Sequence, residues 1–294
     1  MARHMITIWD VIKKIRKIHW IRYKDPVPEE LRGWSHHAPP VRPRAFLGLG
    51  VSEITNRYCE TRRDVYLRRV LRIKNFEKTP PLATGSSVHK IFSEASREVR
   101  KILLSKDPLR EIEKTLEKAE YISKNICGED LKRYCVKLYK TLILSWGSEI
   151  VRERSLYGGD TITSLPWISE LRIDGSLIGL SDRLMIDAII NLSTVVEIKT
   201  GVERDFHKTS LAGYALAIES NIEMPIDYGI LIYVNGFPNN DPEIKFDVIY
   251  ISPDLRKEFI DARDEVIDMI LGGKDPGFSK ECSDHCPFKT FCRG

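Results

Sequence analysis

The order of strand-like segments after residue 157 most strongly limits how this 294-residue chain can fold. A helical pattern at about 207–219 separates three such segments from two more, and helical patterns dominate the chain before them. Helices, three strands, a helix and further strands predict an α/β fold with a mixed sheet. Alternation, aliphatic content and turn signals place the strands at 167–173, 177–186, 194–199, 228–234 and 246–251.

The remaining helices follow from apolar spacing and from capping residues. Residues 1–48 are predicted to form a basic helical extension that precedes the main domain, 49–294. Its helix should cover 8–24 and end at the prolines that follow. Other helices are expected at 52–70, from Thr84 or Ser86 to 104, within 108–155, and at 253–271.

Basic residues are concentrated in the first quarter of the chain. Residues 1–75 contain 17 Lys and Arg against 7 Asp and Glu, a balance of +10 within a total of +4. Such a block is typical of a surface that binds an anionic polymer, and a solvated helix surface is the alternative. The sequence has no apolar run of the ~20 residues that a membrane helix needs and no signal-peptide pattern. We therefore expect a cytoplasmic protein that does not bind membranes. The absence of glutamine and the abundance of Ile, Glu, Lys and Arg fit a thermophile, or a bias of lineage.

An acidic motif and an acid-x-lysine motif form the main catalytic candidate. Gly179-Leu180-Ser181-Asp182 precedes Glu197-Ile198-Lys199, and alternation along a strand places Glu197 and Lys199 on one face. A hairpin turn at 191–193 is expected to bring Asp182 beside Glu197. Two close carboxylates favour a hard divalent cation, and the lysine would orient water or stabilise charge on a phosphate. An ordinary solvent-facing pair on an edge strand is the alternative.

Three further side chains could face the same site. His89 lies early on a predicted helix and could add a metal ligand. Glu170 lies just ahead of the hairpin, and Tyr214 lies on the helix after Lys199 and could contact a phosphate. The alternatives are a helix histidine without function and a packed aromatic ring.

Three of the six cysteines, Cys282, Cys286 and Cys292, lie in the last thirteen residues. Thiolates select zinc or an iron–sulfur cluster, and a four-cysteine site needs one more ligand. Cys59 is the leading candidate, because the two remaining cysteines, at 127 and 135, are expected to be buried on one helix. The spacing does not separate zinc from iron, and His285 keeps a Cys/His zinc site open.

These motifs resemble, in their order, the RecB-like branch of the PD-(D/E)XK nucleases. The order is Gly85 to His89, Asp182, Glu197-x-Lys199 and Tyr214. With one cysteine upstream and three at the C-terminus, the chain resembles the CRISPR-associated Cas-four exonucleases. The segment 58–70 looks most like their archaeal Csa-one subgroup. The resemblance covers about residues 50–294 and implies a restriction-endonuclease-like core with a split iron–sulfur module, about 51–75 and 275–294, that joins the two ends.

The resemblance also implies an activity and its partners. It implies a DNA nuclease, mainly an exonuclease on single-stranded ends, that trims prespacers beside CRISPR integrase proteins during adaptation; the chain could also pair with itself. Two other functions stay open: a weakly active DNA-binding or scaffold subunit of the integration complex, and a zinc-stabilised repair or restriction nuclease. The scaffold is favoured by Ser210, which stands where the family usually has glutamine. The implied residues are Cys59, Cys282, Cys286 and Cys292 for a [4Fe–4S] cluster, His89, Asp182 and Glu197 for Mn²⁺ or Mg²⁺, and Lys199 for catalysis. In a nuclease we also expect Tyr214 to take part in catalysis and the arginine-rich segment after Cys59 to flank the DNA strand, through Arg62, Arg63, Arg68 and Arg69.

Overall fold

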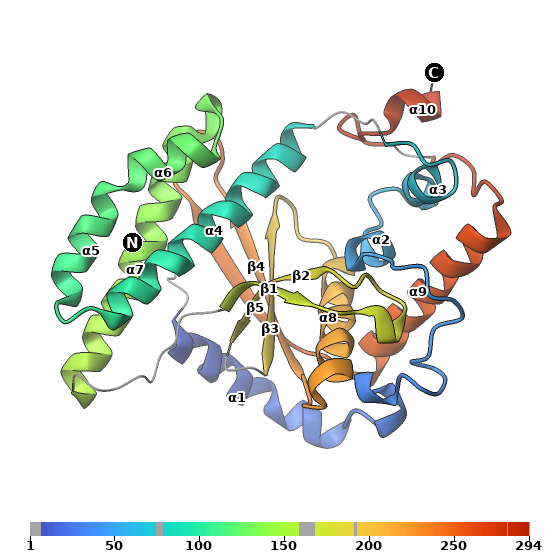
Figure 1. Ribbon diagram of the computed structural model, residues 1–294, viewed down its shortest axis with the longest axis horizontal. Coiled ribbons are helices and arrows are strands. Elements are labelled where there is room, and N and C mark those ends of the chain that lie inside the picture. The colour runs from blue at the N-terminus through green and yellow to red at the C-terminus, as the bar shows by residue number, and fades with distance from the viewer. Residues whose placement is uncertain (1–6, 75–78, 159–167, 191–192, 281, 294) are drawn as a thin grey trace.

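A five-stranded mixed sheet occupies the centre of the computed structural model, which describes residues 7–74, 79–158, 168–190, 193–280 and 282–293 (Figure 1). The strands lie side by side in chain order, and only β3 and β4 are parallel. The predicted α/β fold with a mixed sheet is thus confirmed. The strands are β1 (Ile168–Ile173), β2 (Leu184–Ile190), β3 (Thr194–Thr200), β4 (Tyr228–Asn235) and β5 (Glu243–Tyr250).

The parallel pair requires a crossover, which helix α8 (Phe206–Ile222) supplies. The register pairs Glu197 with Leu231 and Lys199 with Tyr233, so the acid-x-lysine motif lies at the C-terminal end of a central strand. Such strands are buried on both faces, which explains the continuous aliphatic runs in β3 and β4.

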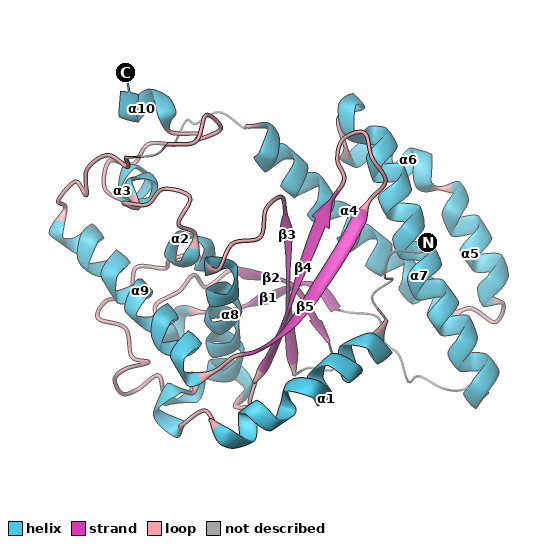
Figure 2. Ribbon diagram, turned by 180° about the vertical axis from the view of Figure 1, so that it is seen from behind, coloured by secondary structure: helices cyan, strands magenta, loops and turns pink. Residues whose placement is uncertain are grey.

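Helices cover both faces of the sheet (Figures 1 and 2). Val196 and Ile198 pack with helices on one face, and Val195 and Leu231 pack with helices on the other. The first layer contains α4 (Pro80–Leu104), α5 (Pro108–Glu117), α6 (Ala119–Ile126) and α7 (Glu129–Tyr157), and the second contains α8 and α9 (Pro253–Gly272).

The N-terminal segment packs on this core instead of projecting from it. Helix α1 (Ile8–Lys24) has the predicted bounds and lies against β5. Two 3₁₀ turns follow, η1 (Glu29–Leu31) and η2 (Gly33–Ser35). The prediction of one helix over 52–70 is wrong. It is two short helices, α2 (Val51–Thr55) and α3 (Arg63–Arg69), because Arg62 adopts a left-handed backbone conformation with φ of 58°.

The predicted second strand also needs correction. The second strand begins at Leu184 and not at 177, because Gly179 has a φ of 78° and ends a 3₁₀ turn, η3 (Ser176–Ile178). Residue 167, the predicted start of the first strand, and most of the predicted turn at 191–193 lie outside the described residues.

Cys127 and Cys135 do not lie on one helix. Cys127 ends α6, Cys135 lies in α7, and the two form a disulfide bond. The expectation that they are buried is confirmed, with exposed fractions of 7% and 1%.

The C-terminal segment returns to the N-terminal half of the protein. After α9 it runs past α3 to the short helix α10 (Lys289–Arg293), and Figures 1 and 2 both show α3 and α10 close together. Phe288 packs against Tyr66 and Leu67 of α3. No helix in the described parts of the chain combines the length and apolar character needed to cross a membrane.

Candidate active site

Glu197 and Lys199 form a buried ion pair at the end of β3. The ammonium donates to Oε1 of the carboxylate over 2.5 Å, and the two side chains are 7% and 18% exposed. Burial raises the pKa of Glu197, and the nearby Asp187 adds to that rise. Burial by itself would lower the pKa of Lys199, but the charge of Glu197 outweighs it and raises that pKa. Lys199 is therefore a fixed cation at neutral pH.

The carboxylate beside this pair is Asp187, and the prediction that Asp182 takes this place is wrong. The β2–β3 register pairs Ala188 with Val196, which puts Asp187 level with Glu197. Oδ2 of Asp187 accepts the backbone N–H of Ile198 over 2.7 Å. Asp182 lies five residues earlier in a turn, 69% exposed, and its ionic partner is Arg183 at 3.8 Å.

A break in the alternation of β2 explains why the sequence pattern missed Asp187. Leu184 and Ile186 pack with one helical layer, whereas Ala188 and Ile190 pack with the other. The side chains of β2 therefore switch faces at Asp187. There the Asp187 carboxylate, and not a backbone carbonyl, accepts the N–H of Ile198 in β3. A pattern search that assumes strict alternation cannot find a residue at such a position.

His89 joins the site from α4, as predicted. Its Nδ1 lies 2.9 Å from Oδ1 of Asp187. Burial opposes a charge on the imidazole, but Asp187 and then Glu197 raise the pKa of His89 above its ordinary value. The predicted grouping of His89, Glu197 and Lys199 is thus present around Asp187, with Asp182 excluded.

Tyr214 approaches from α8, again as predicted. Burial raises the pKa of its hydroxyl well above 10, and the charges of Glu197 and Asp187 add to the effect. Ser210 lies one turn earlier and is 2% exposed, and its hydroxyl donates to the carbonyl of His207 over 2.7 Å. That hydroxyl is engaged within its own helix.

His207 lies next to the lysine and was missed as a site residue. It is 1% exposed, and its ring nitrogens lie 3.2 Å from the hydroxyl of Tyr233 and 3.1 Å from that of Tyr58. Burial and the positive charges of Lys199 and Arg204 lower its pKa to about 4. His207 is thus a neutral link between two tyrosines, and only its position after the acid-x-lysine strand could have signalled it.

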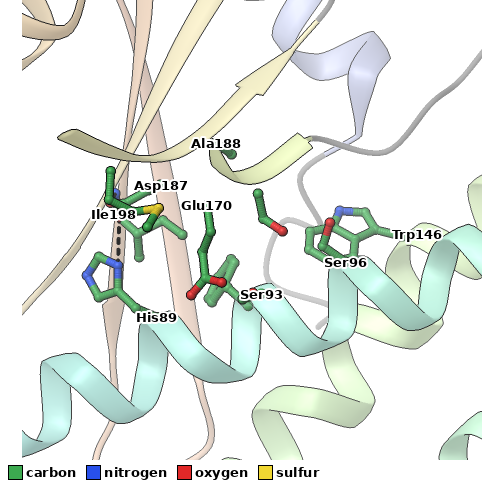
Figure 3. Close-up of a pocket in the computed structure, with 11 residues that line it drawn as sticks. His89, Ser93, Ser96, Trp146, Glu170, Asp187, Ala188 and Ile198 are labelled. Carbon is green, nitrogen blue, oxygen red and sulfur yellow. Dashed lines mark hydrogen bonds and ion pairs between the residues drawn. The ribbon is translucent and has the colours of Figure 1, made fainter. Parts of the chain in front are cut away.

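A pocket of about 130 Å³ opens beside His89 and Asp187. Glu170 of β1 lies at its edge, 40% exposed, and its Oε2 accepts from Arg97 over 3.3 Å. The glutamate has a φ of 53°, so β1 is irregular beside the irregular point of β2. Figure 3 shows the carboxylate of Glu170 directed between His89 and Ser93. Glu170 therefore faces the site, as its position ahead of the hairpin suggested.

The donor chemistry of this site suits a hard divalent cation. Glu197 has a buried Oε2 that lacks a hydrogen-bond partner among the described residues, and such an atom is costly unless a ligand or water satisfies it. Across the described residues, no three His, Cys, Asp or Glu side chains converge closely enough to hold a metal as they stand. The carboxylates of Glu197 and Asp187 contact Lys199 and His89 instead.

The four predicted cluster cysteines are free thiols at the junction of the chain ends. Burial raises the pKa of Cys286, and the neighbouring Cys282 and Cys292 add to that rise. Cys286 and Cys292 pack against the cluster formed by Tyr66, Leu67 and Phe288. Near Cys59, the hydroxyl of Thr61 donates to the carbonyl of Gly277 over 2.9 Å and joins the segments. Thiols select zinc or iron over magnesium, but the described cysteines do not converge as a metal-binding group, so the predicted cluster stays a prediction.

The arginines that were predicted to contact DNA bond within the protein. Arg62 and Arg63 are 7% and 8% exposed. Arg62 donates to the Ile54 carbonyl, and Arg63 donates to Asp275 over 2.8 Å and to Cys292 Sγ over 3.1 Å. Arg68 pairs with Asp64 and Arg69 with Glu53. Burial and these ion pairs indicate a role in joining the two ends, and the predicted DNA contact stays a prediction.

Fold and site define an α/β protein in which a histidine, two carboxylates and a lysine meet at the end of a central strand. Comparison with known sequences identifies one family. The model of the family described as CRISPR-associated exonuclease Csa1 matches residues 5–294. The chain belongs to this family, and the predicted resemblance to it is confirmed.

Two relatives span nearly the whole chain, and both are named CRISPR-associated exonuclease Csa1. The protein from Saccharolobus solfataricus is 37% identical over 281 residues, which cover 90% of this chain and 92% of the relative. The protein from Thermoproteus tenax is 30% identical over 294 residues, which cover 98% and 100%. Relatives of this chain are thus named as exonucleases linked to CRISPR.

Proposed function

We propose that this protein is a metal-dependent DNA nuclease that shortens single-stranded ends, built on a RecB-like PD-(D/E)XK core. The observation that carries the proposal is the buried Glu197–Lys199 pair beside Asp187, with a Glu197 oxygen that lacks a partner in the described residues. The names of the relatives support the reaction class.

The residues have separate roles in this proposal. His89, Asp187 and Glu197 would hold Mn²⁺ or Mg²⁺, which supplies Lewis-acid polarisation of the phosphodiester and a more acidic water. Lys199 stays protonated because its pKa is raised, so it stabilises negative charge on the phosphate and does not act as a base. The Tyr214 hydroxyl likewise stays protonated and can donate to a phosphate oxygen.

Cleavage of end-labelled single-stranded DNA by the full chain tests the proposal. We expect cleavage with Mn²⁺ or Mg²⁺ and none with a chelator. Lys199→Ala or Glu197→Gln should lower the rate at least about 100-fold, as expected for removal of a group that stabilises transition-state charge. The matched control is Lys208→Ala, which removes a half-exposed lysine of α8 whose partner is Asp205.

Each possible result decides between functions. Undiminished cleavage by both active-site variants would contradict the assignment. DNA binding without any cleavage by the unchanged protein would favour the scaffold subunit instead.

For the four cysteines we propose a structural [4Fe–4S] cluster. The packing of Cys286 and Cys292 against α3, which follows the loop that carries Cys59, supports it. Iron and acid-labile sulfide should be present in purified protein and fall after Cys286→Ser. A colourless protein that contains zinc would contradict the cluster and favour the zinc-stabilised nuclease.

We further propose that the biological substrate is a prespacer, processed beside CRISPR integrase proteins. The CRISPR-associated names of both relatives support this setting. Adding purified integrase should alter where this protein stops trimming a duplex with single-stranded overhangs. Identical products with and without integrase would contradict the partnership.

A further inference from the structure

The pocket beside the active site has features of a binding site for one base of the substrate. It lies between α4, α7 and the strands β1 and β2, and it shares His89 and Asp187 with the catalytic cluster. Figure 3 shows Ser93 and Ser96 facing the strands from α4, with Trp146 of α7 beside Ser96. A nucleotide next to the cleaved phosphate would have this pocket within reach.

Two buried hydroxyls in the pocket have no hydrogen-bond partner within the described part of the chain. Ser93 is 4% exposed, and neither its Oγ nor that of Ser169 has a hydrogen-bond partner among the described residues. Buried polar groups are nearly always satisfied, so these hydroxyls point to a ligand or to bound water. A hydroxyl can both donate and accept, as the edge of a base requires.

The size of the pocket limits the ligand to one ring. Its volume is about 130 Å³, and a cavity of about 150 Å³ in another protein holds one benzene molecule. Trp146 and Phe92, only 5% and 3% exposed, form apolar walls and offer no open face for stacking, and Ala188 and Ile198 add aliphatic surface. A single pyrimidine ring fits this space better than a purine.

Glu170 distinguishes between the pyrimidines. Its carboxylate only accepts hydrogen bonds, and one contact from Arg97 to Oε2 leaves further acceptor positions. A carboxylate pairs with the amino group of cytosine, whereas the corresponding oxygen of thymine would be repelled. We propose that this pocket binds an unpaired cytosine next to the cleaved phosphate. This inference rests on the proposed nuclease function.

Binding of short labelled single strands to the Lys199→Ala variant tests the inference without cleavage. The strands end in cytosine, thymine, adenine or an abasic site, placed at each end in turn, and are measured by fluorescence anisotropy with Mn²⁺ present. At one of the two ends, we expect cytosine to bind at least about 10-fold more tightly than the abasic site and about 5-fold more tightly than thymine. Equal binding of all four strands at both ends, or a preference for adenine, would overturn the proposal.

Variants made in the Lys199→Ala background identify the responsible groups. Ser93→Leu fills the pocket and should remove the differences in affinity among the four terminal groups. Ser93→Ala should reduce these differences without adding volume. Glu170→Gln should shift the preference towards thymine, because a carboxamide can donate a hydrogen bond. Ser155→Leu, at an exposed serine of α7, is the control and should change nothing. An unchanged preference in both Glu170→Gln and Ser93→Leu would exclude this pocket as the base site.

The two proposals fail in different ways. If the unchanged protein cleaves no DNA but the cytosine preference is present, the nuclease function is wrong and the pocket stands. If cleavage occurs and depends on Lys199 but the ends bind equally, the pocket is wrong and the nuclease function stands.

Discussion

The position of one aspartate determines the chemistry that the site can carry out. Asp187 contacts His89 from α4 and the Ile198 amide from β3, so it joins a helix to the irregular end of two strands. Asp182 has an exposed carboxylate whose charge is partly neutralised by Arg183, and that arginine would repel a metal cation. At residue scale, the proposed metal site therefore depends on the position in β2 at which the side chains switch faces.

This arrangement predicts opposite results for two acidic residues that are five positions apart. Asp187→Asn should lower Mn²⁺-dependent DNA cleavage about 100-fold or more, because it removes a charged group from the reacting centre. Asp182→Asn should leave the rate within about twofold. The measurement is the initial rate on end-labelled single strands, and equal losses in the two variants would contradict the site as drawn.

The sequence predicted part of this site for definite reasons. Glu197 and Lys199 were predicted because an acid-x-lysine triplet follows a Gly-x-x-Asp motif, and alternation along a strand places both side chains on one face. His89 and Tyr214 followed from their helices and from family order. Asp187 was missed because the alternation that marks a regular strand is broken at that residue.

A second prediction concerns Glu149, whose Oε1 accepts the Ile8 N–H at the start of α1 over 3.0 Å. Burial raises the pKa of Glu149 from 4.5 to about 7, so the folded protein holds this proton more tightly than the unfolded chain. Stability should therefore fall as pH rises from about 4.5 to about 7. Glu149→Gln keeps the acceptor and should reduce the loss by about 1–2 kcal/mol, after allowance for solvent screening.

Urea unfolding at pH 5 and pH 8 checks this expectation. The control is Glu113→Gln, at an exposed glutamate of α5, which should leave the pH dependence unchanged. The same fall in stability in Glu149→Gln as in the unchanged protein would contradict the assignment.

At the scale of elements, short pieces of structure join the two ends of the chain. The loop between α2 and α3 carries Cys59, and α3 packs against Phe288 in the cysteine segment. Arg63 adds a hydrogen bond to Cys292 Sγ and an ion pair to Asp275. The cysteine spacing suggested this junction, but the break at Arg62 depends on backbone conformation that helical periodicity does not report.

Some elements were predictable and others were not, for physical reasons. The apolar spacing of α1 is regular and prolines follow it, so both of its ends were predicted correctly. The boundary between α6 and α7 was missed because only the short Cys127-Gly128 segment separates two stretches of helical composition. That omission also concealed the disulfide.

The disulfide between α6 and α7 should stabilise the helical layer. It closes a short loop between Cys127 and Cys135, eight residues apart, so Cys127→Ser with Cys135→Ser should lower the free energy of unfolding by about 2–3 kcal/mol. Urea unfolding with and without dithiothreitol checks this. Reductant should destabilise the unchanged protein and not the double variant, and equal responses would contradict a bond that stabilises the fold.

At the scale of the whole molecule, a buried ion network connects distant segments. Glu219 of α8 accepts from Arg256 of α9 over 2.7 and 2.9 Å and from Arg32 over 2.9 Å. Asp227, before β4, contacts Arg32 over 2.5 Å and Arg22 of α1 over 2.6 Å. Part of the positive charge of the first quarter is thus neutralised within the protein, which composition alone could not show.

Removing the centre of this network should be costly. Glu219→Ala leaves the buried guanidinium of Arg256 without its main partner and removes one of the two acidic partners of Arg32, so we expect a loss of about 3–5 kcal/mol in the free energy of unfolding. Glu94→Gln breaks a partly exposed ion pair with Arg97 and should change stability by less than about 1 kcal/mol. Chemical denaturation of both variants tests this. Similar losses of unfolding free energy in the two variants would contradict a special role for the buried contacts of Glu219.

The same network restricts how the sequence can evolve. Loss of the acid at 219 alone leaves the buried Arg256 without its main partner, and loss of the acid at 227 removes a partner from both Arg22 and Arg32. Replacement of the whole set by apolar residues can be tolerated, but intermediates with one partner missing are penalised. Across a deep alignment of relatives we therefore expect these five positions to covary, and independent variation would show that their couplings are weak.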